Sequence, residues 1–406
     1  MKLTELKANS IPIGAPLPFA LRDADGTLLA HKGFVIETPS DLEDIVRRGR
    51  GLYVDESEHI HRAYIGKLYT LLQEDTALGQ IASTQLSSRD LPQQAATDEP
   101  PDWLDLQTQT NSLLRDNASA LFFNRLNHVQ ETLAHHTRRN PDGTLFALFH
   151  LSASEVTLYS ATHAMLVSVI CSLAAREVLQ WPPDLEHALT RAALTMNIGM
   201  TDLQDRLAQQ TAPPTPEQRK QITHHAARSV QVLKELGITD AVWLDAVRDH
   251  HGVAPGPLAD KGAAQRIARL IQRADMFAAR LAPRASRFPI SPAAAMQATY
   301  FDENRQVDEA GSALIKAVGI YSPGSFVRLS SNEVAVVVRR GADTTTPRVA
   351  VLINRSGMPI MEPIVRDTGL NEYRIAASVP HRDVKIKLNL QRMLPLTTGA
   401  GTDRPW

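Results

Sequence analysis

The sequence predicts a mainly α-helical protein, with a small α/β or β unit before the helical domain and a small antiparallel β unit after it. Three observations support this fold class. Apolar residues recur with the helical period from about residue 111 to 318. β-branched runs separated by turn residues follow residue 319, and a hairpin signal lies near the N-terminus. The expected segments are 1–65, 66–110, 111–318, 319–396 and 397–406.

The first segment, residues 1–65, is expected to form a small, mainly β unit. Asp23-Ala24-Asp25-Gly26 is a turn sequence between two apolar stretches, which is typical of a β-hairpin. The expected elements are strands at 17–22, 28–30 and around 52–54, and a short capped helix at 40–46.

Residues 66–110 are expected to be a helix followed by a polar linker. From residue 84 to 110 the chain is rich in Ser, Gln, Asp and Pro and contains little that a core could bury. Such a composition favours a linker that is at least partly mobile.

Residues 111–318 contain helices with recognisable start and stop signals. A long apolar helix is predicted from Glu155 to Trp181, where Pro182-Pro183 stops it. Thr215-Pro216-Glu217-Gln218 has the spacing of a capping box and opens a helix that Gly237 ends. Further helices are expected from Asp240 to His251, from Ala263 to Leu281 and from Pro292 to Tyr300.

Residues 319–396 change to β character. Three β-branched runs, at 326–329, 334–338 and 348–353, are separated by Asn and Gly residues and predict a small antiparallel sheet. Residues 397–406 are expected to be a disordered tail.

Composition indicates a cytoplasmic protein. The 43 basic and 44 acidic side chains nearly cancel, so the net charge gives no field that attracts DNA or a membrane surface. No apolar run approaches the ~20 residues that cross a bilayer, and the N-terminus has no apolar signal core. The single cysteine, Cys171, excludes an internal disulfide and lies in an apolar run, so it is expected in the core.

A set of histidines with one aspartate carries the candidate chemistry. Neutral imidazole nitrogens and carboxylate oxygens are ligands for divalent metals. A two-metal phosphohydrolase uses a bridging carboxylate to hold two ions about 4 Å apart. The candidate ligands lie on separate helices and are His163, His225, His250, His251 and Asp275.

Residues 155–318 resemble the HD-GYP family, the cyclic-di-GMP phosphodiesterase branch of the bacterial HD superfamily. Several separated segments agree with the family in order and spacing. They are Tyr159-Ser160-Ala161-Thr162-His163, His225 with Ser229 and Leu233, Asp249-His250-His251-Gly252, Ala274-Asp275-Met276-Phe277-Ala278-Ala279, and the arginines Arg284 and Arg287. The resemblance implies an HD-type all-α core, and it implies that Arg284 and Arg287 hold phosphate.

The departures from the family pattern are equally specific. Met196 and Asn197 stand where the family has its name-giving His-Asp pair, and Met200 replaces a lysine that would meet a phosphate. Gly252 replaces a glutamate, and Gly256-Pro257 is the remnant of the Gly-Tyr-Pro loop. Asparagine cannot supply the bridging negative charge, so the resemblance implies loss of at least one of the two metals.

One metal ion can still be accommodated. By the family's arrangement one site keeps His163 and Asp275, whereas the other keeps His225, His250 and His251. Three imidazoles can hold a single zinc, iron or manganese ion, as three-histidine catalytic sites hold zinc. The expected cofactor is therefore one divalent ion at the three histidines, or none.

Simpler interpretations of the same residues stay open. A His doublet at a helix end interacts favourably with the helix dipole, and His163 among apolar neighbours is compatible with a hydrogen-bonded core histidine. Asp275 is compatible with a surface salt bridge. Helical spacing cannot choose between His224 and His225; the register of the resemblance chooses His225. Met196 and Met200 are expected to fill the space of the absent ligands.

Three functions follow from this pattern. The leading hypothesis is a catalytically impaired HD-GYP-type protein, a pseudoenzyme that binds a cyclic dinucleotide such as cyclic-di-GMP. In that role it relays a signal to a protein partner such as a diguanylate cyclase, with a homodimer as a further expectation. The second is a single-metal phosphohydrolase that hydrolyses cyclic-di-GMP, and the third is an interaction scaffold without a small ligand.

Overall fold

The structure is a computed structural model that describes residues 102–398 apart from 116–121, 155–157, 283–284, 286–289 and 387. Of the first hundred residues it describes short stretches between residues 3 and 55. By internal contacts the chain separates into two compact units, Met1–Pro100 and Pro101–Trp406. The five-segment division expected from the sequence stays a prediction.

The N-terminal unit contains a four-stranded antiparallel sheet in the order β1-β4-β2-β3. The two predicted strands of the hairpin pair antiparallel, with Leu21 of β2 opposite Ala30 of β3, and residues 24–26 of the predicted turn lie outside the described residues. Residues 41–42 and 45–46 are helical, as the sequence predicts. Leu17, Leu21, Ile36 and Val54 form a small apolar core. The strands are β1 (Leu3–Leu6), β2 (Leu21–Arg22), β3 (Leu28–Ala30) and β4 (Leu52–Asp55).

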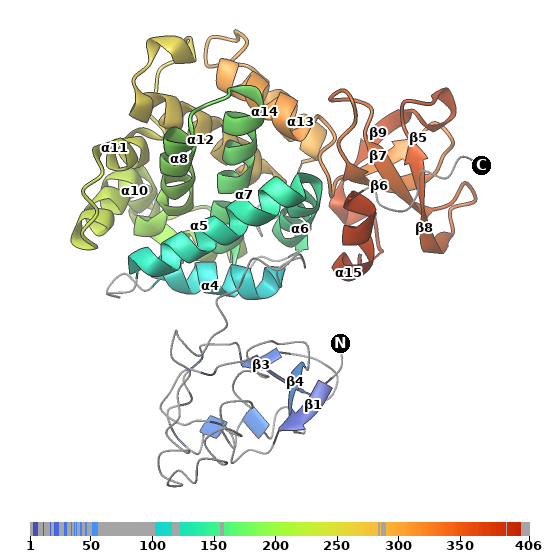
Figure 1. The fold of residues 1–406 in the computed structure, drawn as a ribbon, viewed down its shortest axis with the longest axis horizontal. Coiled ribbons are helices and arrows are strands. Elements are labelled where there is room, and N and C mark those ends of the chain that lie inside the picture. The colour runs from blue at the N-terminus through green and yellow to red at the C-terminus, as the bar shows by residue number, and fades with distance from the viewer. Residues whose placement is uncertain are drawn as a thin grey trace. The chain divides into compact units, whose positions relative to one another are not determined.

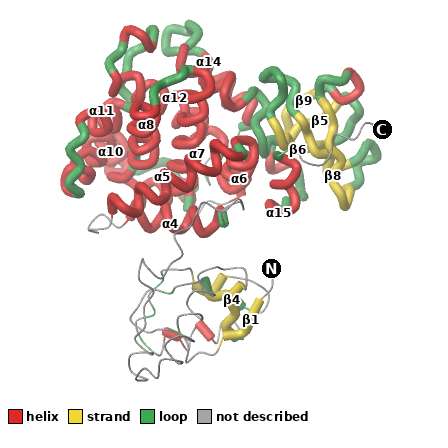
Figure 2. Tube along the Cα trace, viewed as in Figure 1, coloured by secondary structure: helices red, strands yellow, loops and turns green. Residues whose placement is uncertain are grey.

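The second unit is an all-α core with a β sheet at its C-terminal end (Figure 1; Figure 2). The predicted fold class, a helical core flanked by small antiparallel sheets, is confirmed. The helices of the described residues are α4 (Trp103–Arg115), α5 (Phe122–Arg139), α6 (Pro141–Ser154), α7 (Tyr159–Leu173), α8 (Pro183–Thr195), α9 (Thr201–Gln209), α10 (Pro216–Glu235), α11 (Ala241–Asp249), α12 (Ala263–Leu281), α13 (Pro292–Tyr300), α14 (Glu309–Val318) and α15 (Leu390–Met393).

Helix α7 is the central element of the core. All of its residues are buried, and it packs against α6, α8 and α12. It continues into a π-helical turn, η2 (Ala174–Val178), and Pro183 then opens α8 at its first position. The stretch Tyr159–Val178 is long and apolar enough to cross a membrane, but 83% of it is buried inside the protein. That burial is the pattern of a core helix.

The predicted caps of the following helices are present. Thr215 and Gln218 form a capping box at the start of α10, and Gly237 ends this helix with a positive φ of 83°. The side chain of Asp240 accepts a hydrogen bond from the Trp243 amide and begins α11. These caps fix the ends of the two helices that carry most of the candidate ligands.

The C-terminal sheet is larger than the sequence predicts. Its order is β8-β7-β6-β5-β9, with all pairs antiparallel. Strand β8 was missed because its two prolines argue against a strand, but β8 lies at the sheet edge, where proline is tolerated. The strands are β5 (Phe326–Leu329), β6 (Val334–Arg339), β7 (Arg348–Ile353), β8 (Pro359–Asp367) and β9 (Ile375–Val379).

One face of this sheet packs on the helical core. Phe146 of α6 belongs to the same buried cluster as Phe326 and Val336. Arg340, just after β6, donates hydrogen bonds to Asp142 (2.6 Å) and Glu177 (2.8 Å) on the helical side. The sheet is therefore attached to the helices by both apolar and ionic contacts.

Three details of the sequence prediction are wrong. Helix α4 begins at Trp103, within the predicted linker, because Trp103 and Leu106 are buried in the core. Thr397, assigned to the disordered tail, is buried, and its hydroxyl oxygen accepts a hydrogen bond from Asn140 Nδ2 at 2.8 Å. The helix expected from Glu155 to Trp181 ends earlier, because α7 ends at Leu173 and the π-helical turn η2 ends at Val178. A 3-10 turn, η3 (Ile198–Met200), comes after α8 ends at Thr195.

Candidate metal centre

Three histidines from two neighbouring helices meet at one point. His225 lies in the middle of α10, His250 is the C-cap of α11, and His251 follows it. Their candidate ligand atoms all lie within 4.8 Å of one another. His225 and His250 are buried, whereas His251 is exposed. His224, the alternative to His225, is exposed and its Nδ1 lies 2.8 Å from the Lys220 carbonyl oxygen.

The backbone fixes which nitrogens of the two buried imidazoles are protonated. Nδ1 of His225 lies 2.6 Å from the Ile222 carbonyl oxygen, and Nδ1 of His250 lies 2.7 Å from that of Val247. A carbonyl oxygen only accepts, so both Nδ1 atoms carry the proton and donate it. The Nε2 atoms of the two neutral rings therefore carry lone pairs.

These two lone-pair nitrogens face each other. Nε2 of His225 and Nε2 of His250 are 3.1 Å apart. Two acceptors at this distance repel unless a cation or a shared proton lies between them. Two nitrogens bound tetrahedrally to one zinc ion at about 2.0–2.1 Å would be about 3.3 Å apart. The spacing therefore suits two ligands of one metal ion.

Burial keeps the buried imidazoles neutral. Burial, with a smaller effect from the neighbouring His251, lowers the pKa of His250 to about 3. Burial likewise lowers the pKa of His225. A neutral ring is the form that binds metal, so both histidines are in the ligand state at neutral pH.

His163 and Asp275 form a second group beside the first. Nε2 of His163 in α7 lies 2.7 Å from Oδ1 of Asp275 in α12. Tyr159 stacks on the His163 ring at a centroid distance of 5.5 Å. Burial raises the pKa of Asp275, but the His163 hydrogen bond and the nearby imidazoles outweigh it and hold the pKa well below its usual range. The carboxylate is therefore ionised and already paired with protein.

The segment that replaces the His-Asp pair lies against α10. Met196 is buried in the core, with 1% of its surface exposed. The Gly199 amide donates a hydrogen bond to Ser229 Oγ (3.0 Å), one turn beyond His225. Within the described part of the chain, the buried side-chain oxygen of Asn197 has no hydrogen-bond partner. An orphaned oxygen of this kind suits a missing water or cation, although it brings no negative charge.

Not all predicted site residues fall within the described part of the chain. Arg284 and Arg287, the predicted phosphate-binding residues, lie outside it. Arg280 lies inside it and donates to the Met276 carbonyl oxygen at 3.0 Å.

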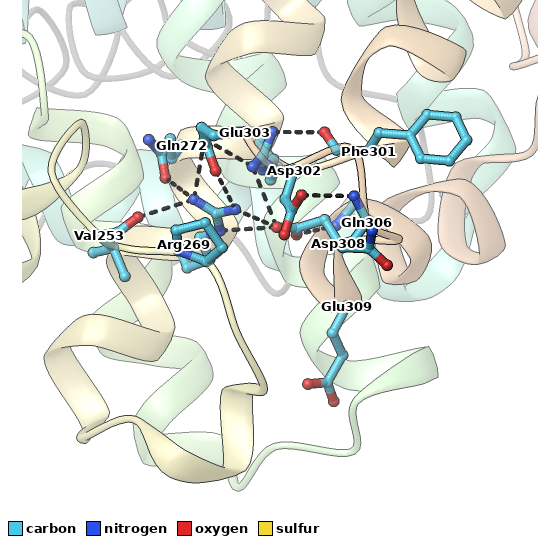
Figure 3. A network of polar contacts seen from close by, with 12 residues as sticks. Val253, Arg269, Gln272, Phe301, Asp302, Glu303, Gln306, Asp308 and Glu309 are labelled. Carbon is cyan, nitrogen blue, oxygen red and sulfur yellow. Dashed lines mark hydrogen bonds and ion pairs between the residues drawn. The ribbon is translucent and has the colours of Figure 1, made fainter.

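Sequence reasoning missed a buried ionic network beside the histidines. Arg269 and Arg273 of α12 are 1% exposed and are paired with Glu303 and Asp308 (Figure 3). The available signal was two arginines one turn apart, with the apolar residues Leu270 and Ile271 between them. Close to this network lies a cavity of about 400 Å³ lined by Pro255, Gly256, Pro257, Asp302, Asn304, Gln306, Val307, Asp308 and Glu309.

The three histidines fit a divalent metal ion. The donor set is three imidazole nitrogens, of which two have their tautomer fixed by backbone carbonyls, the outer-shell arrangement typical of metal-binding histidines. His163 and Asp275 instead satisfy each other. The geometry therefore favours one metal-binding site, at the three histidines, over two.

Comparison with known proteins identifies one curated relative. The chain is 27% identical over 233 residues to the cyclic di-GMP phosphodiesterase PA4108 of Pseudomonas aeruginosa, which is 56% of this chain and 55% of the relative. The chain thus spans about half the length of that relative. No family model matches the chain. This homology confirms the resemblance to a cyclic-di-GMP phosphodiesterase.

Among solved structures the chain is similar to Bd1817, an HDG"Y"P protein from Bdellovibrio bacteriovorus. The similarity covers 77% of this chain and 98% of that one, with 13% identity and a TM-score of 0.42. At this level of similarity it supports no conclusion about fold or function.

Proposed function

We propose that this homologue of a cyclic-di-GMP phosphodiesterase binds one divalent metal ion through His225, His250 and His251 and recognises a cyclic dinucleotide without efficient turnover. The expected ligand is cyclic-di-GMP, which carries two phosphodiester anions. The protein would act in the bacterial cytoplasm as a binding or relay module.

The facing Nε2 atoms of His225 and His250, 3.1 Å apart, carry the proposal. Their separation costs repulsion that a cation between them would remove. Zinc, iron and manganese all bind imidazole, and the geometry does not choose among them. When bound, the ion supplies Lewis-acid polarisation of a phosphoryl oxygen.

The arrangement around the histidines argues against efficient turnover. A second ion would need the carboxylate of Asp275 and the ring of His163 as ligands, and these two groups are hydrogen-bonded to each other at 2.7 Å. It would also need a bridging anion, and Asn197 offers a neutral oxygen. Breaking the His163–Asp275 hydrogen bond costs free energy that no bridging anion would offset. We therefore do not expect two metal ions to bind a phosphate here together.

Phosphate recognition is assigned to Arg284 and Arg287. Guanidinium groups bind phosphate oxygens in a planar, bidentate way and keep their charge at every physiological pH. This assignment comes from the resemblance and stays a prediction.

A single-metal phosphodiesterase is the second candidate function. It is favoured by the same three imidazoles, since three-histidine sites with an open position are catalytic in other zinc enzymes. An interaction scaffold without a small ligand is the third candidate function. The expected diguanylate cyclase partner and the expected homodimer stay predictions. Hydrolysis of cyclic-di-GMP by metal-loaded protein, abolished by His250→Ala, would favour the second candidate over the first.

The test compares alanine substitutions of two adjacent histidines of α10, His224 and His225. His225→Ala should abolish binding of added Co²⁺, because it removes one of three ligands, whereas His224→Ala should bind as the unmodified protein does. A calorimetric titration with cyclic-di-GMP should then show binding that Arg284→Ala weakens. Equal Co²⁺ binding by the two histidine variants would overturn the metal assignment, and no heat of binding would overturn the ligand assignment.

A further inference from the structure

A glutamine of α12 contacts the loop that carries His251. Gln272 Nε2 donates a hydrogen bond to the His251 carbonyl oxygen at 3.2 Å. Gln272 Oε1 accepts a hydrogen bond from Arg269 at 2.9 Å. Gln272 thus uses both ends of its amide, and Arg269 fixes which end faces His251.

Arg269 binds the same loop directly. Its guanidinium donates to the Val253 carbonyl oxygen at 2.9 Å, two residues beyond His251. It is 1% exposed, so its charge is stabilised by the protein and not by water. The stabilising groups are Glu303 and Asp308, both within hydrogen-bond distance (Figure 3). The guanidinium is therefore fixed in orientation.

The carboxylates come from a rigid segment, residues 301–309, which we call the acidic strap. Asp302 Oδ1 accepts hydrogen bonds from the amides of Asn304 and Gln306, both at 2.8 Å. Asp308 caps α14 by accepting from the Gly311 amide at 2.9 Å. The strap is thus held by hydrogen bonds of its own in addition to its contacts with the loop.

The acidic strap also holds the far end of the loop. Glu309 accepts a hydrogen bond from the Leu258 amide at 2.7 Å. The loop from His251 to Leu258 is therefore anchored by Gln272 and Arg269 near its start and by Glu309 at its end. Of the three histidine ligands, His251 is the exposed one, and its position depends most on this anchoring.

We propose that Gln272 and Arg269 are positioning residues for the metal site: they hold the backbone of His251 so that its imidazole joins those of His225 and His250. This inference rests on the proposed function. The contacts act on a ligand through its own backbone, and outer-shell contacts of metal ligands typically change affinity 10- to 100-fold when removed.

Gln272→Met tests the proposal, because it keeps the size of the side chain and removes both hydrogen bonds. We expect about tenfold weaker Co²⁺ binding and a changed visible absorption spectrum of the bound Co²⁺. Thermal unfolding in chelator should be unchanged within a few degrees. Gln265→Met, the same change at an exposed position of the same helix, is the control and should bind Co²⁺ as the unmodified protein does.

Gln272→Glu separates the two contacts. It keeps an acceptor for Arg269 but places an oxygen against the His251 carbonyl, so it should weaken Co²⁺ binding at least as much as Gln272→Met. Equal affinity and spectrum in all three variants would overturn the proposal.

Amide hydrogen exchange distinguishes a failure of this inference from a failure of the proposed function. In metal-free protein, Gln272→Met should raise exchange over residues 251–258 several-fold, and Gln265→Met should not. If the unmodified protein binds no Co²⁺, the proposed function fails, and faster exchange still supports positioning of the loop. Unchanged exchange would overturn the positioning role whether or not metal binds.

Discussion

Gly199→Ala should destabilise the helical core through a backbone collision. A Cβ at this position would lie 2.6 Å from the Ser229 amide nitrogen and 2.8 Å from the Arg228 carbonyl carbon. Both are backbone atoms of α10, which cannot move as a flexible side chain would. The substitution would push the 196–200 turn away from the helix that carries His225.

The expected cost has two parts. Overpacking in a close contact costs about 1–3 kcal/mol. The displaced turn also loses the 3.0 Å hydrogen bond from Gly199 to the fully buried Ser229 hydroxyl, which adds about 1 kcal/mol. A total near 3 kcal/mol corresponds to a fall in Tm of about 5–10 °C for a domain of this size.

Thermal unfolding in chelator measures this cost, with Gly252→Ala as the matched control. A Cβ at Gly252 meets its nearest atom, the Asp249 carbonyl oxygen, at an ordinary 3.9 Å. That variant should stay within about 1 kcal/mol of the unmodified protein. If Gly199→Ala unfolds at the same temperature as Gly252→Ala, the close approach of the turn to α10 is refuted.

Three further predictions concern groups outside the histidine cluster. Burial, with a smaller contribution from His150, lowers the pKa of His381 from 6.5 to about 4, so stability is constant above pH 6.5 and is lost as pH falls towards 4. In chemical unfolding, the part of the stability loss between pH 7 and 5 that depends on His381 should be up to about 2 kcal/mol, and a slope that His381→Gln leaves unchanged would contradict this. Asn197→Asp should lower the Tm in chelator, because it buries an unpartnered carboxylate at a cost of about 1–3 kcal/mol, and should raise the metal content on elemental analysis; no change in either would refute the role of this oxygen. Arg340→Met should cost about 2–3 kcal/mol in urea unfolding by leaving the partly buried carboxylate of Asp142 unpaired, and a cost below about 0.5 kcal/mol would show that the pair is not stabilising.

Local signals in the sequence predicted the helices and strands that depend on neighbours along the chain. The capping box at Thr215 and the cap at Asp240 act within one turn, so they are readable without tertiary information. Strand β8 and the first turns of α4 were missed because they depend on partners distant in sequence. Tertiary contacts decide such elements.

The candidate site was predictable as a set of residues but not as an arrangement. The sequence selected His163, His225, His250, His251 and Asp275. The structure brings the three histidines of α10 and of the end of α11 together, and it pairs His163 with Asp275. The tautomers depend on backbone carbonyls, which no motif records. Arg269 pairs with strap residues 34 and 39 positions further along the chain, and the periodicity of the sequence does not indicate that contact.

Elemental analysis of the protein, purified without added metal and without chelator, tests the central claim most directly. The account predicts about one zinc, iron or manganese ion per chain, lost in His225→Ala and kept in His224→Ala. Two ions per chain would contradict the single-metal assignment, and protein free of metal that also fails to take up added Co²⁺ would contradict the metal site itself.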